Sequence, residues 1–525
     1  MREPDSEHRV GQDNIQFWGL DVHHPVFFVS AGLIVLFVAL TLVFQQNAAN
    51  VFNAIKTFMT GTFGWFFMLA VNVFVLFVLV VAFSPLGKIR LGGRDATPDF
   101  SYGAWFAMLF SAGMGIGIMF WSVAEPVFHY KSPPLGASGA TPEAAQVAMA
   151  ATLFHWGLHA WAVYAVVGLA LAFFAFNRGL PLTIRSAFEP LFGQAAWGWL
   201  GHIIDTLAVF ATLFGLATSL GLGVQQANAG LHFLFGTPDT IAVQVVLIML
   251  ITGIATMSVV AGLESGVKRL SQLNMVLAAL LLLFVLSLGP TGFILKGLGQ
   301  YTSAYLQNLP QLSSWFGRDS GWLSSWTVFY WAWWIAWSPF VGMFIARISR
   351  GRTVRQFVIG VLLVPTLITF VWMAAFGGSA LHQILNGVGD LSGAVNANVA
   401  TAMFVMLQQL PLSQLASFVG IILVIVFFVT SSDSGSLVID SITAGGKLEA
   451  PVPQRVFWAI TEGIVAAVLL LGGGLAALQT ASITTGLPFA IVLCLMCVGL
   501  LKGLRQERRE YAQQPTADLP TEAAD

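Results

Sequence analysis

"SAGMGIGIMFW", residues 111–121, lies in the middle of an apolar segment long enough to cross a membrane, yet its composition opposes a continuous helix. Gly113 and Gly117 alone could serve close packing between helices. Gly115 weakens the helix further, because each glycine costs about 1 kcal/mol of helix propensity relative to alanine. Non-helical backbone at this depth is tolerated only where it is buried in protein or lines a cavity. The run therefore favours a broken helix over simple tight packing.

A second apolar segment carries an interruption of another kind. "WAWWIAWSP", residues 331–339, ends at Pro339, just past the middle of its span. Proline removes a helix hydrogen bond and frees carbonyl groups, so we expect this helix to be interrupted near the bilayer centre as well. The two segments are the third and the eighth of the chain, and repeats that are five spans apart must have inverted topology. Interrupted helices at matching positions of two halves indicate a transport site.

Composition places the chain in a membrane. Of its 525 residues, 57% are hydrophobic and 9% are charged, whereas a soluble domain carries roughly a quarter charged residues. The net charge of −1 gives no basis for nucleic-acid binding. Cys494 and Cys497 form a C-x-x-C inside an apolar run, where two lipid-compatible side chains are a better interpretation than a metal or redox site. The polar N-terminus lacks the apolar core of a signal peptide.

Twelve apolar stretches reach the roughly 20 residues that a bilayer requires. They lie near residues 25–44, 63–83, 102–124, 145–176, 202–225, 239–262, 272–290, 324–346, 355–377, 413–438, 454–472 and 478–501. We therefore expect an all-α integral membrane protein with 12 transmembrane helices. Its parts would be an N-tail (1–24), two accessory helices (25–83), a five-helix repeat (102–290), an outer amphipathic helix (291–321), an inverted repeat (322–501) and a C-tail (502–525).

The positive charges fix the expected orientation. With both termini in the cytoplasm, the outer side keeps only Lys56, Lys131, Lys296 and Arg318 of the 23 Lys and Arg residues. This bias alternates loop by loop, as the positive-inside rule requires. A wrong number of spans would scramble the alternation. We therefore expect a multi-pass protein with both termini cytoplasmic.

The tryptophans of the eighth span are too deep for a membrane anchor. Trp322 and Trp326 fit an interfacial belt, but Trp333, Trp334 and Trp337 lie near mid-membrane. Core packing is the alternative. It is less favoured, because buried indole N–H groups need partners and bulky rings separate helices that should pack closely.

The fourth span adds a second aromatic group within "FHWGLHAWAVY". Trp156, Trp161 and Tyr164 occupy one arc of about 140° at 100° per residue. Two aromatic groups facing one cavity suit a quaternary ammonium, which cannot donate an N–H bond and binds by cation–π attraction. His155 and His159 are spaced for a metal, but no acid accompanies them in this segment, so packing or a hydrogen bond between helices is the favoured interpretation.

The tenth span ends in "FFVTSSDSGS", with clustered hydroxyls at Thr430, Ser431 and Ser432. These side chains either bond back to carbonyls of their own helix or coordinate a hard cation such as Na⁺. Asp433 is an acid in or near the membrane. It is a functional candidate, although a helix cap or a pair with an arginine would also explain it.

At these residues the chain resembles the betaine/choline/carnitine transporter family. The similarity covers "WTVFYWAWWIAWSPFVGMFIARISRGRTVRQF" (326–357), "GMGIGIMFWSVAEP", "FHWGLHAWAVYAVVG" and "TSSDSGS", and extends from about Asp21 through the last span. The resemblance implies the leucine-transporter-type 5+5 inverted repeat with two extra N-terminal helices. It also implies a homotrimer in the bacterial cytoplasmic (inner) membrane and a part in osmoprotection.

The resemblance also implies residue roles. The substrate site would consist of Trp156, Trp161, Tyr164, Trp333, Trp334, Trp337, Met114, Gly115 and Gly117, with Phe344 on the exit path. One Na⁺ would be held by backbone carbonyls of Ser111, Met114 and Phe427 and by the hydroxyls of Thr430 and Ser431. A second Na⁺ would use Thr212 and Phe340, but Leu216 replaces the second threonine of that site, which puts it in doubt.

Gly117 bears on the substrate. Proton-coupled choline carriers of the family tend to have an aspartate there, so the glycine favours a zwitterion such as glycine betaine with Na⁺. We expect a symporter that works by alternating access, with Na⁺ as coupling ion and no other cofactor. The alternative is a proton-coupled carrier of choline, carnitine or a sulfonium analogue. An enzyme is disfavoured, because the spans show no nucleophile–base pattern, metal cluster or nucleotide loop.

Overall fold

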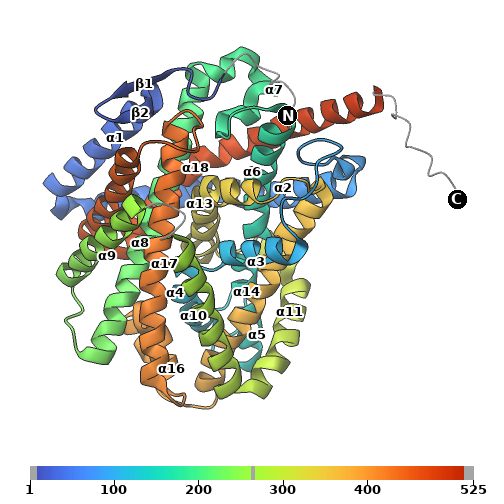
Figure 1. Cartoon of the computed structure of the whole chain (residues 1–525). Helices are drawn as coiled ribbons and strands as arrows, with labels where there is room; N and C mark the ends of the chain where they lie inside the picture. The colour runs from blue at the N-terminus through green and yellow to red at the C-terminus, as the bar shows by residue number, and fades with distance from the viewer. Residues whose placement is uncertain (1–8, 262–266, 514–525) are drawn as a thin grey trace, which may run out of the picture.

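The computed structural model describes residues 9–261 and 267–513. A short N-terminal β-hairpin lies beside α1, and long helices form the rest of the molecule (Figure 1). The strands are β1 (Asn14–Phe17) and β2 (Leu20–His23). The helices are α1 (His24–Val43), α2 (Gln45–Phe83), α3 (Tyr102–Gly113), α4 (Ile116–Lys131), α5 (Pro142–Trp156), α6 (Leu158–Arg178), α7 (Glu189–Phe192), α8 (Trp199–Phe235), α9 (Ile241–Ala261), α10 (Val267–Leu288), α11 (Thr291–Ser313), α12 (Ser320–Ser325), α13 (Thr327–Arg347), α14 (Val354–Leu385), α15 (Leu391–Ala397), α16 (Ala402–Gln408), α17 (Ser413–Thr443) and α18 (Val452–Gln513).

The described residues contain ten helices long and apolar enough to cross a membrane, or eleven when the bent pair α3 and α4 counts as one span. This confirms a multi-pass, all-α membrane protein. Helix α18 is 62 residues long, and its backbone is non-helical at Gly473 and Gly474. It therefore combines the stretches that the sequence predicts as spans eleven and twelve. The count of twelve and the inverted repeat stay predictions.

The helices divide into central and peripheral ones. Most residues of α6, α8 and α13 are buried, whereas the apolar residues of α1, α9 and α10 are largely exposed, as lipid-facing helices require. Helix α13 packs against α6, α8 and α18 and lies in the middle of the bundle (Figure 1). The residues that α13 carries therefore lie in the interior of the protein.

The glycine run breaks its helix as predicted. Helix α3 ends at Gly113, α4 begins at Ile116, and the two axes differ by 64°. Met114 and Gly115 between them are extended, with φ/ψ of −97°/129° and −172°/−173°. The Gly115 carbonyl accepts from the Met119 N–H at 3.4 Å, the first bond of α4. The break leaves N–H groups in the first turn of α4 and carbonyls in the last turn of α3 without partners inside a helix.

The predicted interruption at Pro339 is wrong, because α13 continues as one helix from Thr327 to Arg347. Proline has no N–H for the carbonyl of Ile335, four residues earlier. The hydroxyl of Ser338 donates to that carbonyl oxygen at 2.7 Å and replaces the missing bond. Only one member of the expected pair of broken helices is therefore broken, so the family resemblance and not a matched pair of breaks supports the inverted repeat.

Residues 291–321, predicted as an amphipathic helix, contain α11 and the first two residues of the short α12. Helix α11 buries Ile294, Tyr301 and Tyr305 on one face and exposes Leu295 and Leu306 on the other. The buried face packs against α5 and α14. The exposed leucines show that the outward face is not purely polar.

The N-terminal hairpin is a feature that the sequence did not indicate. Its turn is Trp18–Gly19, where both residues have positive φ, and the Trp18 side chain is 95% exposed. Asp21 pairs with Lys447, which lies between α17 and α18. Burial raises the pKa of Asp21, but the hydrogen bond and charge of Lys447 outweigh this effect, so the pKa lies below its usual value. Residues 9–24 of the predicted N-tail therefore belong to the fold, and residues 1–8 lie outside the described residues.

Candidate functional site

The break between α3 and α4 opens onto a cavity of about 190 Å³. The predicted substrate residues lining it are Met114, Gly115, Gly117, Trp156, Trp161, Tyr164, Trp333, Trp334, Trp337 and Phe344, and the predicted ion ligands are Ser111, Phe427, Thr430, Ser431 and Phe340. Thr212 is absent from the described lining; its hydroxyl donates to the carbonyl of Ala208 on its own helix, α8. The structure thus brings together all predicted site residues except Thr212, and their roles in binding stay predictions.

The aromatic rings enclose one side of this cavity. Trp333 and Trp334 stack with centroids 5.0 Å apart and planes 12° apart. The edge of Trp156 meets Trp334 at 4.8 Å and 72°. Tyr164 meets Trp334 at 6.3 Å and Trp161 at 5.3 Å. Rings from α5, α6 and α13 therefore converge, which is the arrangement required to surround a quaternary ammonium.

Gly117 is packed against these rings. A Cβ atom at this position would lie 2.7 Å from Cη2 of Trp333 and 3.0 Å from Cη2 of Trp156. Both distances are below normal carbon–carbon contact. An aspartate at residue 117 would require both indoles to move, so glycine is needed for this ring arrangement.

Hydrogen bonds hold most of the indoles in place. Trp334 Nε1 donates to the carbonyl of His155 at 2.8 Å, and Trp337 Nε1 donates to that of Gly215 at 2.8 Å. His155 belongs to the last turn of α5, whose carbonyls lack partners within the helix. Trp331, in contrast, stacks on His159 with planes 6° apart and is not among the described lining residues. Trp331 is therefore a packing residue.

The start of α4 also lines the cavity, next to the rings. Gly117 and Ile118 lie in the first turn of α4 and line the cavity. The N–H groups of a first helical turn have no partners within the helix, and the helix dipole is positive there. The site thus combines electron-rich rings with the electropositive end of a helix, which can receive the two ends of a zwitterion.

The hydroxyl cluster of α17 is divided between two faces. Thr430, Ser431 and Ser434 line the cavity, whereas the Ser432 hydroxyl donates to Glu462 of α18 at 2.9 Å. Asp433 accepts a hydrogen bond from Ser258 of α9 at 2.7 Å, away from the cavity. The acid predicted as a functional candidate therefore belongs to a contact between helices.

Thr430 bonds back to its own helix, which is one of the two interpretations of its sequence motif, and coordination of a cation stays a prediction. Its hydroxyl donates to the carbonyl of Val426 at 3.0 Å and accepts from Asn274 Nδ2 at 2.9 Å. The other amide atom of Asn274, Oδ1, is buried without a hydrogen-bond partner among the described residues. Asn274 of α10 lines the cavity. Its amide oxygen is a candidate cation ligand that the sequence analysis did not identify. A lone Asn in an apolar segment was its only signal.

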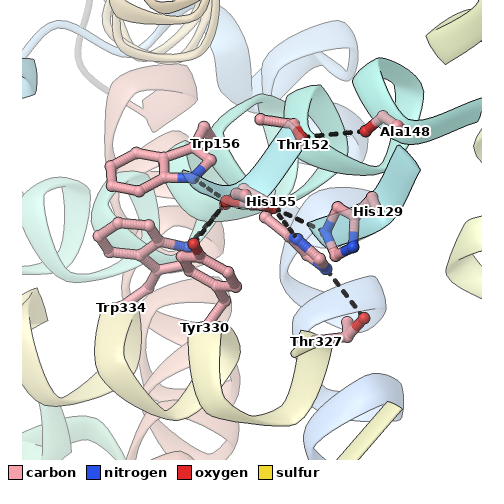
Figure 2. Close-up of polar contacts among 9 residues, drawn as sticks. His129, Ala148, Thr152, His155, Trp156, Thr327, Tyr330 and Trp334 are labelled. Carbon is pink, nitrogen blue, oxygen red and sulfur yellow. Dashed lines mark hydrogen bonds and ion pairs between the residues drawn. The ribbon is translucent and has the colours of Figure 1, made fainter. Parts of the chain in front are cut away.

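A polar network outside the cavity lining adjoins the rings. Glu125 Oε1 lies 2.6 Å from His155 Nδ1 and 3.2 Å from His129 Nε2. Figure 2 shows the rings of Trp156, Trp334 and Tyr330 on one side of His155, with His129 and Thr327 on the other. His155 is not accompanied by an acid within its own helix, but α4 supplies one.

Glu125, His129 and His155 could hold a metal ion, because one ligand atom from each lies within 4.8 Å of the others. Glu125 Oε1 is within hydrogen-bonding distance of both histidines. The tryptophans predicted as interfacial anchors pack on this network: Trp322 stacks on His155 at 5.7 Å, and Trp326 meets His129 at 4.6 Å. Trp322 is buried, so its prediction as a membrane anchor is wrong.

Comparisons with known proteins agree with this architecture. The profile of the betaine/carnitine/choline family transporters matches residues 25–509. The chain is 53% identical to a glycine betaine/proline/choline transporter of Vibrio parahaemolyticus, covering 96% of this chain and 95% of that protein. It is 55% identical to glycine betaine transporter 1 of the same organism, over 96% and 98%. It is 46% identical to a glycine betaine transporter of Acinetobacter baylyi, over 92% and 73%. The chain belongs to the betaine/carnitine/choline family of transporters.

Proposed function

We propose that the protein is a sodium-coupled symporter that imports a quaternary-ammonium zwitterion such as glycine betaine by alternating access. One observation carries this proposal: the stacked Trp333 and Trp334 share a cavity with the opened backbone at Met114 and Gly115. The ammonium group would lie among the rings, where cation–π attraction offsets part of its lost hydration. The carboxylate would meet the N–H groups at the start of α4.

The relatives support this substrate class. Proteins 46% and 55% identical to the chain are named glycine betaine transporters. A relative 53% identical is named for proline and choline as well. A range of small ammonium compounds is therefore expected to compete. Gly117 favours a zwitterion over a proton-coupled cation, because the tight contact with Trp333 leaves no room for an acid.

The coupling ion would bind between the helix break and α17. The carbonyls of Ser111, Met114 and Phe427 and the hydroxyls of Thr430 and Ser431 would supply its oxygen ligands. Hard cations prefer such oxygen atoms. The Asn274 amide lies beside Thr430, and its oxygen, which has no hydrogen-bond partner in the described part of the chain, adds another candidate ligand. A second Na⁺ at Thr212 and Phe340 has weaker support, since only Phe340 lines the cavity.

The proposal also covers the number of spans, their orientation, the oligomeric state and the membrane. We infer twelve spans arranged as two inverted five-helix repeats after two accessory helices, with both termini in the cytoplasm. The protein would be a homotrimer in the bacterial inner membrane. The charge asymmetry of the loops supports this orientation.

Uptake of labelled glycine betaine into proteoliposomes tests the proposal. We expect uptake that requires an inward Na⁺ gradient, continues without a pH gradient and is reduced by excess unlabelled betaine. Choline, carnitine, proline and ectoine serve as competitors. Rapid uptake without Na⁺ would overturn sodium coupling, and a failure of every quaternary ammonium to enter would overturn the substrate class.

A further inference from the structure

The carboxylate of Glu125 is a buried charge that touches the aromatic site without lining it. Its side chain, on α4, is fully buried. Oε2 accepts from Trp156 Nε1 at 2.9 Å and from the Tyr330 hydroxyl at 2.5 Å. Oε1 lies against His155 and His129 at 2.6 and 3.2 Å. One oxygen therefore faces the rings of the site, and the other faces the histidines.

Trp156 needs such an anchor because of its place in the chain. It is the last residue of α5, directly before Gly157, where the backbone leaves the helix. Its ring forms the edge contact with Trp334 at 4.8 Å. Its Nε1–H is donor-only, and its bond to Glu125 defines how the ring is turned. A change in that bond would alter the surface that the rings offer to a ligand.

The bond also has an electrostatic consequence. The described residues that line the cavity include no acidic or basic side chain. A quaternary ammonium there would depend on the negative potential of the ring faces. An anion that accepts a hydrogen bond from an indole N–H polarises the ring and makes its face more negative, because hydrogen-bonded groups strengthen one another in a low dielectric. Glu125 is one indole away from the cavity and can act through Trp156.

We propose that Glu125 is a positioning residue that fixes Trp156 and supplies, through its indole, the negative potential by which the site prefers a cation. This inference rests on the proposed function. His155 holds the opposite side of the carboxylate, and its other ring nitrogen lies 2.9 Å from the Thr327 hydroxyl. The network thus fixes both oxygens of Glu125, which keeps the charge at the Trp156 N–H.

The test is Glu125→Gln, which keeps the size of the side chain, removes its charge and replaces one acceptor oxygen by an N–H donor. The amide oxygen can still accept from Trp156 and Tyr330, and the amide N–H can donate to a neutral His155. We expect the KM for betaine to rise about tenfold, the scale of a cation–π contact, with a maximal rate close to that of the wild type. Glu462→Gln is the matched control, because Glu462 is also fully buried but bonds to Ser432 on the far face of α17.

A second ligand separates this role from a structural one. In 3,3-dimethylbutyrate a carbon atom replaces the nitrogen of glycine betaine, so shape and carboxylate are kept while the positive charge is lost. Glu125→Gln should leave its inhibition constant unchanged and so reduce the preference for betaine about tenfold. A loss of packing would weaken both ligands together, and that result would overturn the proposal.

A double-mutant cycle completes the test. Trp156→Phe removes the indole N–H, and in that background Glu125→Gln should have no further effect on the KM. Additive effects of the two substitutions would also overturn the proposal. Wild-type protein that takes up no quaternary ammonium would refute the proposed function, whereas normal wild-type uptake with an unchanged KM in Glu125→Gln would refute only this inference.

Discussion

The α3/α4 junction and helix α13 both line the cavity, and their backbones differ. Met114 and Gly115 are extended, and the helix axis turns by 64°. Helix α13 continues through Pro339, because Ser338 satisfies the carbonyl that the proline leaves free. The first region therefore offers backbone groups to a ligand and the second offers side chains. The difference teaches that a helix breaker opens a helix only where no neighbouring group replaces the lost hydrogen bond.

The largest effect is expected from removing a ring of the intact helix. Trp334→Ala deletes the partner of the Trp333 stack and the contact with Trp156. Loss of one desolvated cation–π contact and of ring packing should lower betaine kcat/KM at least about a hundredfold. Labelled uptake measures this, and the amount of protein in the membrane should be unchanged.

Trp331→Phe is the matched control for that substitution. Trp331 lies on the same helix but stacks on His159 outside the cavity lining. Its replacement by another ring should keep uptake close to that of the wild type. If Trp334→Ala transports normally, the aromatic site is misassigned.

The broken region gives a sharper contrast between two glycines. Gly117→Ala places a methyl group 2.7 Å from Trp333, and overpacking of this kind costs about 1–3 kcal/mol. Gly115→Ala meets no atom within 4 Å, and its extended backbone is open to any residue. We expect Gly117→Ala to lower uptake about tenfold and Gly115→Ala to change it less than about twofold. A larger effect at Gly115 would show that helix weakness, and not ring packing, explains the glycine run.

These two regions show what the sequence could predict. The glycine run predicted the break between α3 and α4, since helix propensity is a local property. The depth of Trp333, Trp334 and Trp337 in the membrane predicted an interior aromatic site, since this depth follows from their position within the span. The family profile and the relatives then confirmed the transporter class that the motifs implied.

Other features depend on neighbours that are distant in sequence. Proline was expected to interrupt its helix, but the outcome depended on the rotamer of Ser338, which no periodicity reveals. Glu125 and His155 are 30 residues apart and meet only through the packing of α4 and α5. Asn274 reaches Thr430 from another helix for the same reason. Contacts between helices decide side-chain pairing, and a single sequence does not specify them.

The predicted ion ligands offer a test with a built-in control. Thr430→Val keeps the shape of a cavity-lining residue and removes its hydroxyl oxygen. The Na⁺ concentration for half-maximal uptake should rise about tenfold, as expected for loss of one of several oxygen ligands worth about 1.4 kcal/mol. Ser432→Ala, which alters the same motif on the face toward Glu462, should leave that concentration unchanged. Equal shifts in both variants would argue against an ion site on the cavity face of α17.

The smallest expected effect tests why α13 stays intact. Ser338→Ala leaves the carbonyl of Ile335 without a partner, which should cost about 1–2 kcal/mol of stability because an unsatisfied buried acceptor is unfavourable. Pro339→Ala restores a backbone N–H to the same carbonyl, so Ser338→Ala in that background should cost close to nothing. Thermal unfolding of the detergent-solubilised variants measures both differences. Equal costs in the two backgrounds would mean that the serine hydroxyl does not replace the bond that proline removes, and the continuity of α13 would then have to come from its packing against α6, α8 and α18.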